Sequence, residues 1–324
     1  MTATQPPSAT PIGRGPEEDR TYYGRPALKA APFEKWVVGG YIFLAGLSGA
    51  AQLLSTVADL VGRKKDEAVV SYGRWLSALA PTVGSALLIY DLNTPKRFYN
   101  MLRILKRTSP MSIGTWLLMA FSAFGGMTLS CTLLAGRLPR LRRVARVTQI
   151  PAAVAGAGLS TYTASLLSAT STPLWAAAPK ALAIRFGSSS VAAGAAALSL
   201  GARHRGRHRA ARDLDTLMVV ALMVEALATV ASENTCHKKR ISVGTEGNGL
   251  QAAATVGMLL PVGLHAISIA TRRRDTRLQH WASWIALAGS LCLRVSVLEA
   301  GIESANRPRD YFRFARPENL PPGT

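Results

Sequence analysis

Residues 36–60 read WVVGGYIFLAGLSGAAQLLSTVADL, a run whose single charged residue, Asp59, lies near its far end. A block of roughly 20 mainly apolar residues, rising about 1.5 Å per residue, matches the ~30 Å hydrocarbon core of a lipid bilayer. Comparable blocks follow along the chain at residues 75–91, 112–135, 148–168, 181–201, 214–232, 250–270 and 281–302. The sequence therefore predicts an all-α integral membrane protein with about eight transmembrane helices in a bundle.

Polar segments flank this apolar region on both sides. Residues 1–35 contain six prolines and the acidic cluster 17–19, and they lack a basic segment followed directly by a short apolar one. We therefore expect no cleaved signal peptide here and an uncleaved first helix. The predicted organisation is a polar N-terminal tail (1–35), an eight-helix transmembrane domain (36–302) and a polar C-terminal tail (303–324).

The chain carries a formal net charge of +20 over 324 residues. Such a charge raises the question of nucleic-acid binding, but the basic residues lie between apolar blocks and no soluble fold could present them as a stripe. Basic residues beside membrane spans face anionic lipid and fix the topology. The charge therefore indicates membrane loops, and we expect no nucleic-acid partner.

Eight spans place both termini on one side of the membrane. Lysine and arginine are evenly divided between the two sides, but residues 137–146, 203–212 and 272–277 form compact basic clusters with little acid. Short basic loops favour the cytoplasmic side. We therefore expect a multi-pass protein of a bacterial cytoplasmic membrane, with both tails and segment 91–111 facing outward.

Cysteine and histidine are scarce. Cys131, Cys236 and Cys292 are too few and too scattered to hold an iron–sulfur cluster. Only His265 lies within a predicted span, whereas a membrane cytochrome b needs paired histidines on inward helix faces. The sequence predicts no haem, no iron–sulfur cluster and no metal site in this chain.

Two loop segments and the start of the first predicted span carry a distinctive pattern of residues. The first loop segment comprises Asp91-Leu92-Asn93-Thr94-Pro95-Lys96-Arg97-Phe98-Tyr99-Asn100-Met101, then Thr108-Ser109-Pro110-Met111-Ser112 and Gly114-Thr115-Trp116. The second runs from Tyr162-Thr163 to Thr172-Pro173-Leu174-Trp175, and the first span is entered through Pro32-Phe33-Glu34-Lys35-Trp36. Together these segments resemble the NrfD / polysulfide reductase membrane-subunit family, and the resemblance extends over roughly residues 20–305.

The resemblance implies a quinone-reactive membrane anchor subunit of a modular oxidoreductase. Such a subunit binds menaquinone or ubiquinone as its substrate near one face and carries no haem or other prosthetic group. It exchanges electrons with a ferredoxin-like subunit holding several [4Fe-4S] clusters, which usually connects to a molybdopterin catalytic subunit. The absence of haem and cluster ligands in the sequence agrees with this expectation.

Quinone chemistry needs hydrogen-bond donors at both carbonyl oxygens and a group that takes or gives protons. Polar residues at the outward level of spans one, two and four meet this need, and Asp91 and Tyr162 lie within the family-like segments. Interfacial tyrosines also occur without any ligand, and this alternative stays open for Tyr41 and Tyr90. The predicted quinone-binding residues are Glu34, Tyr41, Tyr90, Asp91, Tyr162 and Thr163.

Ionisable residues deep in a span are costly, by roughly 2.5–3.5 kcal/mol on insertion scales, and are usually paired or functional. Glu225 and Arg294 fall at similar depth in spans six and eight, so we predict a charge pair that either fixes packing or relays protons. Glu299 lies near the outward end of span eight. A proton path could be drawn from it through Glu303, Asp59, Gln52 and His265, although snorkelling to water also explains Asp59 and His265.

Two rival functions are weighed against the quinone-reactive subunit. A secondary transporter tends to show helices broken by paired Gly/Pro interruptions, whereas Pro81, Pro151, Pro179 and Pro261 fall near the predicted span ends. A purely structural anchor with a degenerate quinone pocket is the other alternative.

Overall fold

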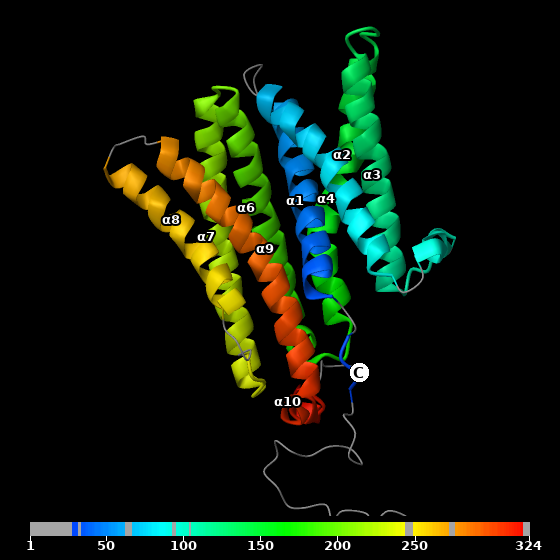
Figure 1. Cartoon of the computed structure of the whole chain (residues 1–324), viewed down its shortest axis with the longest axis vertical. Coiled ribbons are helices and arrows are strands. Elements are labelled where there is room, and N and C mark those ends of the chain that lie inside the picture. The colour runs from blue at the N-terminus through cyan, green and yellow to red at the C-terminus, as the bar shows by residue number, and fades with distance from the viewer. Residues whose placement is uncertain are drawn as a thin grey trace, which may run out of the picture.

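The chain folds into long helices joined by short connections (Figure 1). The computed structural model describes residues 28–31, 34–61, 67–92, 95–103, 105–243, 249–271 and 276–319. The eight long helices in these ranges are α1 (Lys35–Val61), α2 (Glu67–Tyr90), α3 (Pro110–Leu134), α4 (Leu141–Ser168), α6 (Pro179–His204), α7 (His208–Lys238), α8 (Gly249–Ala270) and α9 (Thr276–Asn306). Four short segments are η3 (Pro95–Leu102), α5 (Pro173–Ala177), α10 (Pro308–Phe314) and η4 (Pro317–Asn319). Each predicted span is a helix, which confirms the all-α fold.

The outside of the molecule is suited to lipid. Seven helices in the described ranges are long and apolar enough to cross a membrane, and α2 meets the same criterion when taken with η3, which bends away by 117°. Large apolar side chains point outward along these helices, with Leu227 72% exposed and Val154 69% exposed. An apolar exterior on this scale is unfavourable in water and favourable in a bilayer. The chain is a multi-pass membrane protein.

The helices extend beyond the apolar blocks that predicted them. Helix α2 begins at Glu67 and α4 at Leu141, where the blocks began at 75 and 148. The added turns contain charged residues, which an apolar run excludes but which can lie in the headgroup region or pair with one another. As a result Pro81 and Pro151 lie well inside α2 and α4. Pro261 lies well inside α8, whose bounds nearly match the predicted block, and only Pro179 of the four begins a helix in the described ranges, so the expectation that the other three fall near span ends is wrong.

Proline and a capping serine fix several helix starts. Pro110, Pro179 and Pro308 each occupy the first position of a helix, where the missing N–H leaves no intrahelical bond unmade. Before α3, the Ser109 hydroxyl accepts a hydrogen bond from the Ser112 backbone N–H at 3.4 Å. The polar family-like loop therefore determines where α3 enters the membrane.

The long helices form two groups of four. Helices α1–α4 pack together as the first bundle, and α6–α9 pack together as the second bundle. The bundles meet where α1 and α4 contact α6 and where α1 contacts α9, as Figure 1 shows. Within the first bundle, α1 and α4 approach so closely that a Cβ at Gly49 would overlap the Gly156 backbone. Small residues at this crossing thus allow the two backbones to touch.

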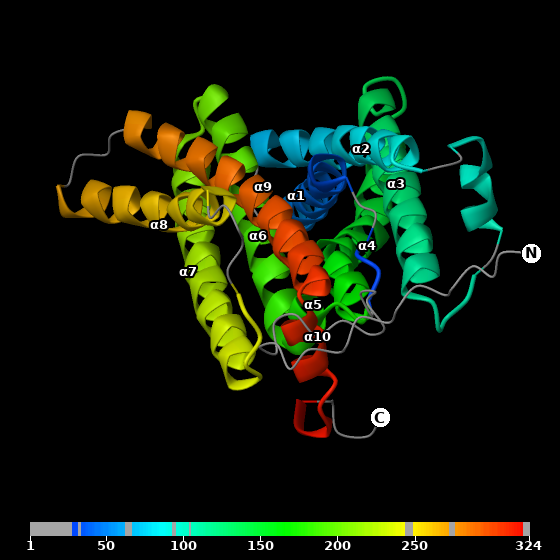
Figure 2. The same cartoon turned by 60° about the horizontal axis from the view of Figure 1, so that its bottom comes forward.

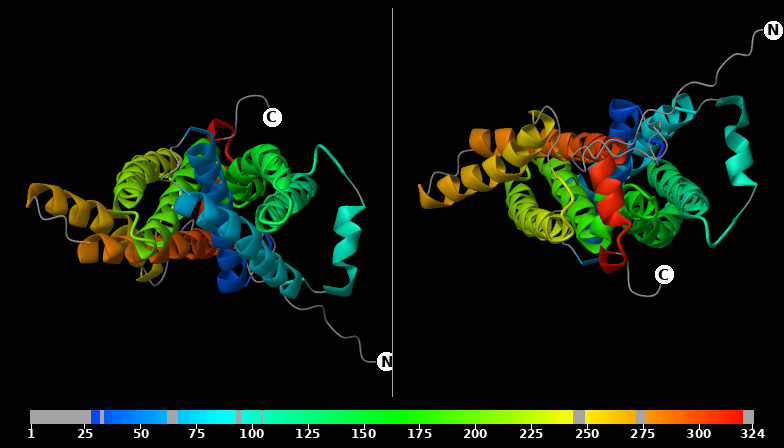
Figure 3. Two further views of the ribbon diagram at one scale, coloured as in Figure 1. Left: turned by 90° about the horizontal axis from the view of Figure 1, so that it is seen from above. Right: turned by 90° about the horizontal axis from the view of Figure 1, so that it is seen from below.

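The start of α1 and the end of α9 lie at the same end of the molecule, which we call the terminal face (Figure 1). Segment η3 also lies there and stands apart from the bundles in Figures 2 and 3. The residues from 303 onward, expected as a polar tail, continue α9 to Asn306 and then form α10. Asp310 and Tyr311 of α10 are buried, so this part of the tail packs against the second bundle.

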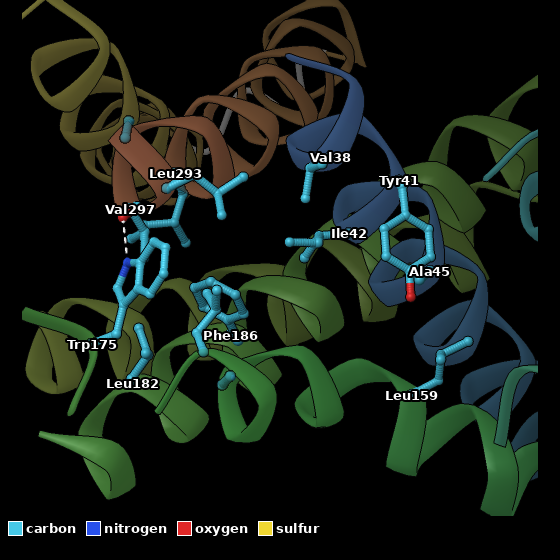
Figure 4. Packing of buried hydrophobic residues seen from close by; sticks show 14 of the residues in the cluster. Val38, Tyr41, Ile42, Ala45, Leu159, Trp175, Leu182, Phe186, Leu293 and Val297 are labelled. Carbon is cyan, nitrogen blue, oxygen red and sulfur yellow. Dashed lines mark hydrogen bonds between the residues drawn. The ribbon is translucent and has the colours of Figure 1, made fainter. Parts of the chain in front are cut away.

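A hydrophobic core lies between the two bundles on the terminal side. It contains Ile42 of α1, Phe186 of α6 and Leu293 of α9, as seen in Figure 4. Trp175 of α5 is 1% exposed, and its indole N–H donates to the Val297 carbonyl of α9 at 2.8 Å. Helix α5 therefore attaches the connection between α4 and α6 to the second bundle.

Candidate functional site

Asp91 and Glu34 come together at the terminal face of the first bundle. Asp91 directly follows α2, and Glu34 precedes α1. The Glu34 carboxylate accepts a hydrogen bond from the Val37 backbone N–H at 2.6 Å and so caps α1. Partial burial is the main cause that raises the pKa of Asp91 above its usual 3.8; the Glu34 backbone N–H opposes this shift and the Glu34 charge adds to it. The structure thus brings two predicted site residues from different helices to one point.

Two tyrosines lie deeper in the same bundle. Tyr41 of α1 is 8% exposed, and Tyr162 of α4 packs against the hydrophobic cluster that contains Tyr41. In Figure 4, Tyr41 extends from α1 into the core beside Leu159 of α4. The ring of Tyr162 lies directly over Gly114 of α3, where a Cβ would overlap the ring. Gly114 therefore makes the space in which the phenol sits.

The remaining two predicted quinone ligands lie elsewhere. Thr163 is 2% exposed on the α4 stripe that faces α1, one turn after Ser160, whose hydroxyl reaches the Gly46 carbonyl at 3.4 Å. Tyr90, the last residue of α2, is 78% exposed. The sequence grouped these residues by depth, and the structure separates them by helix face.

Arg294 lies at the centre of a buried serine cluster between α6 and α9. Its side chain is 1% exposed, and Nη1 donates to the Ser189 hydroxyl at 2.7 Å and to the Ser290 hydroxyl at 2.9 Å. Nη2 donates to the Ser190 hydroxyl at 2.9 Å and to the Phe186 carbonyl at 3.2 Å. These neutral acceptors solvate the guanidinium in place of water.

Glu225 of α7 lies beside this cluster and is 3% exposed. Its carboxylate interacts electrostatically with Arg294 and with the Ser189 hydroxyl. Within the described ranges no ion pair within 4.0 Å joins Glu225 to Arg294, and the Oε2 atom of Glu225 has no hydrogen-bond partner. The two residues predicted as a pair therefore lie at one level, with Ser189 interacting with both.

Arg185 of α6 is a further member that the sequence reasoning missed. It interacts with Glu225 and with Glu233 of α7, and its Nε atom has no partner. Counting residues from the start of span five would have placed it near the depth of Glu225.

Glu299 does not join the Arg294 cluster. Its Oε1 atom lies 2.5 Å from Lys35 Nζ, and this pair connects α9 to the start of α1 at the terminal face. Glu303 instead pairs with Arg307 at 2.8 Å. The proposed proton path through these carboxylates is therefore divided between separate ion pairs.

Asp59 and His265 also lie in separate places. Asp59 accepts a hydrogen bond from Gln149 at 2.6 Å and lies 3.5 Å from Arg74, inside the first bundle. His265 lies in the second bundle, with its Nδ1 atom 3.4 Å from Gln279 Oε1. Asp59 and His265 therefore do not lie on one proton path.

A buried ion pair closes the α6–α7 hairpin at the end opposite the terminal face. Arg203 of α6 pairs with Asp215 of α7, whose side chain is 1% exposed. The Ser199 hydroxyl also donates to Asp215, at 2.6 Å. The sequence placed Arg203 in a loop, because the apolar block ended at 201.

Side chains that could bind a metal ion are scattered over the described ranges. No group of three or more His, Cys, Asp or Glu side chains there could hold a metal ion. Cys131, Cys236 and Cys292 are free thiols.

The chain was compared with known protein families and with curated proteins. A family model described as polysulphide reductase, NrfD, matches residues 30–305, from before α1 to the last turn of α9. No curated protein matches the chain. The family comprises membrane subunits of quinone-linked oxidoreductases, which in general pair with catalytic and iron–sulfur subunits. Because the match covers most of its length, the chain belongs to the NrfD polysulphide reductase family.

Proposed function

We propose that this chain oxidises or reduces a membrane quinone at the terminal face of the first bundle and exchanges the electrons with an iron–sulfur partner subunit. One observation carries the proposal: Glu34 and Asp91 meet where α1 begins and α2 ends, and Tyr41 and Tyr162 pack in one cluster of the same bundle. The family match supports a quinone as the ligand. The substrate is menaquinone or ubiquinone.

The chemistry of these groups suits a two-electron, two-proton reaction. Oxidation of a quinol releases two electrons and two protons, so the site needs a donor to the ring oxygens and a proton acceptor. The Tyr162 hydroxyl would hydrogen-bond one ring oxygen, with Tyr41 and Thr163 lining the approach. Asp91 and Glu34 would carry protons between the ring and water at the terminal face. The raised pKa of Asp91 lets its carboxyl hold a proton at less acidic pH than a free aspartate.

The electron partner would dock on η3 and the surface around it. None of the eight residues of η3 is buried, and Phe98 and Tyr99 are 41% and 50% exposed. Exposed aromatic rings beside Lys96 and Arg97 are suited to a protein surface with acidic and apolar patches. We propose a ferredoxin-like subunit with [4Fe-4S] clusters here, joined to a molybdopterin subunit, in a complex of the bacterial cytoplasmic membrane.

Tyr162→Phe tests the quinone site. This change removes the hydroxyl and keeps the ring on Gly114, so loss of one hydrogen bond should slow quinol turnover about three- to tenfold, corresponding to ~0.5–1.5 kcal/mol. The matched control is Tyr72→Phe, because Tyr72 lies at the opposite end of the molecule, packed on Gly201 and 5.5 Å from Arg205. That variant should keep wild-type turnover.

Asp91→Asn tests the proton role in the same assay, which uses the assembled complex with its subunit content verified by blotting. It should lower turnover more than it lowers quinol affinity. Wild-type kinetics in both the Tyr162 and Asp91 variants, with the complex intact, would place the quinone elsewhere.

Co-purification tests the docking surface separately. Replacing Phe98 and Tyr99 together by Ser should reduce the amount of iron–sulfur partner retained on the tagged chain. The control replaces Trp281 and Trp284 by Ser, since these residues are 63% and 52% exposed on α9. This variant should retain as much partner as the wild type. Retention of the partner by the first variant would show that η3 is not the docking surface.

A further inference from the structure

A small polar cavity opens beside the second bundle on the terminal side. Its volume is about 50 Å³, and it lies among α5, α6, α7, α8 and α9. Its polar lining comes from Arg185, Ser232, Glu233, Gln251 and Ser296. A cavity of this size with several polar partners can hold water. Neither Tyr41 nor Tyr162 lines this cavity, and the proposed quinone reaction does not use it.

Glu225 lies about two helical turns deeper in α7 than Ser232, the nearest α7 residue that lines the cavity. Arg185 connects the two, since it lines the cavity and interacts with both Glu233 and Glu225. Unpartnered atoms mark this connection: Arg185 Nε, Arg294 Nε and Glu225 Oε2 are all buried without a hydrogen-bond partner. A buried carboxyl with one free oxygen is costly as a purely structural element. A carboxyl in this position is suited to gaining and losing a proton.

Two of the neighbouring helices supply the positive charges near Glu225. Helix α6 contributes Arg185 and α9 contributes Arg294. From Gly249 to Leu264, α8 contains no charged or histidine residue. Two cations therefore face Glu225, and Arg185 is shared with Glu233 of α7, so either protonation state of Glu225 leaves the site free of excess negative charge.

Apolar side chains pack the face of α7 that leads from Glu225 toward the end of the molecule opposite the terminal face. Residues 215, 218, 222 and 225 share one face of the helix, and Met218 and Leu222 are 0% and 2% exposed. They separate Glu225 from the Arg203–Asp215 pair, ten residues or about 15 Å away along the helix. Packed apolar side chains of this kind exclude water.

We propose that Glu225 is a proton-exchanging carboxyl that communicates with the terminal face alone, through the Arg185–Glu233 cavity. Protons enter from water at the cavity, bind the free Glu225 oxygen and leave by the same route, while Arg185 and Arg294 balance the charge. The Met218–Leu222 layer blocks exchange with the opposite face. This proposal is independent of the quinone site, and its test uses no quinol.

Infrared difference spectroscopy of the reconstituted protein tests the proposal. Wild-type protein should show a carboxylic-acid C=O band that changes with pH and shifts on exchange into D₂O. Glu225→Gln should remove that band, and Glu225→Asp should move it, which identifies the group even if one of the two variants folds poorly. A Glu225 band that neither titrates nor exchanges, or no such band at any pH, would overturn the proposal.

The route is tested by blocking each end. Ser232→Leu fills the cavity and should slow hydrogen–deuterium exchange of the band at least about tenfold. Ser188→Leu is the matched control. Ser188 does not line the cavity, and its hydroxyl bonds the Ile184 and Arg185 carbonyls of its own helix, so the exchange rate should stay as in the wild type. Ser283→Leu, beside Arg203 at the other end, should leave the rate unchanged. Slower exchange in the Ser283 variant, with a normal rate in the Ser232 variant, would assign access to the opposite face and overturn the proposal.

Discussion

The ring of Tyr162 in α4 rests on Gly114 of α3 with no room for a single methyl group between them. Gly114→Ala should therefore displace the phenol, destabilise the protein by about 1–3 kcal/mol and lower quinol turnover. Gly126→Ala, in the same helix with no neighbouring atom within 4 Å, provides the control. Thermal unfolding in detergent and turnover of the complex measure the two effects. Equal behaviour of the two variants would show that the Tyr162 position does not matter.

The second prediction concerns Asp91 and pH. Because its pKa is raised in the folded protein, the folded chain holds a proton that the unfolded chain has released at pH values just above 3.8. Its contribution to stability is therefore present at lower pH and is lost as pH rises through the raised pKa. Unfolding midpoints measured across the acid range should show this fall in the wild type and a flatter profile in Asp91→Asn. Parallel profiles would contradict the prediction.

The third prediction is energetic coupling between Glu225 and Arg294. Removing one partner leaves a buried charge with less compensation, which typically costs ~3–5 kcal/mol, whereas replacing both is often nearly neutral. Glu225→Gln and Arg294→Met should therefore each destabilise the protein more than the double variant does. The free energies of unfolding of the four proteins give the coupling. Additive effects would mean that the shared Ser189 contact transmits no interaction.

The fourth prediction concerns the ion pair that closes the α6–α7 hairpin. Arg203→Met leaves the Asp215 carboxylate, 1% exposed, with Ser199 as its hydrogen-bond donor, and should cost ~3–5 kcal/mol. Arg209→Met, an exposed position in the same basic segment, should cost well under 1 kcal/mol. Unfolding midpoints of the two variants decide the question. Similar small losses would show that the Arg203–Asp215 pair adds nothing to stability.

The eight helices could be predicted because apolar blocks of membrane length are unambiguous in the sequence. Their ends could not, since turns with Arg74 or Arg203 become stable only through partners on other helices. Depth along a span grouped Glu225 with Arg294, and both residues interact with the Ser189 hydroxyl. It could not tell that Tyr90 faces outward while Tyr162 faces Gly114, because that depends on the rotation of each helix and on its neighbours.

The link from Trp175 to Val297 has a consequence for how the molecule unfolds. Two bundles of four helices could melt as separate units, each with its own transition. Helix α5, however, holds the connection from the first bundle against α9 of the second through a buried hydrogen bond, and the Trp175 ring lies on Gly301. Neither half can lose its packing at this end without exposing the other. The protein should therefore denature cooperatively, as one thermodynamic unit.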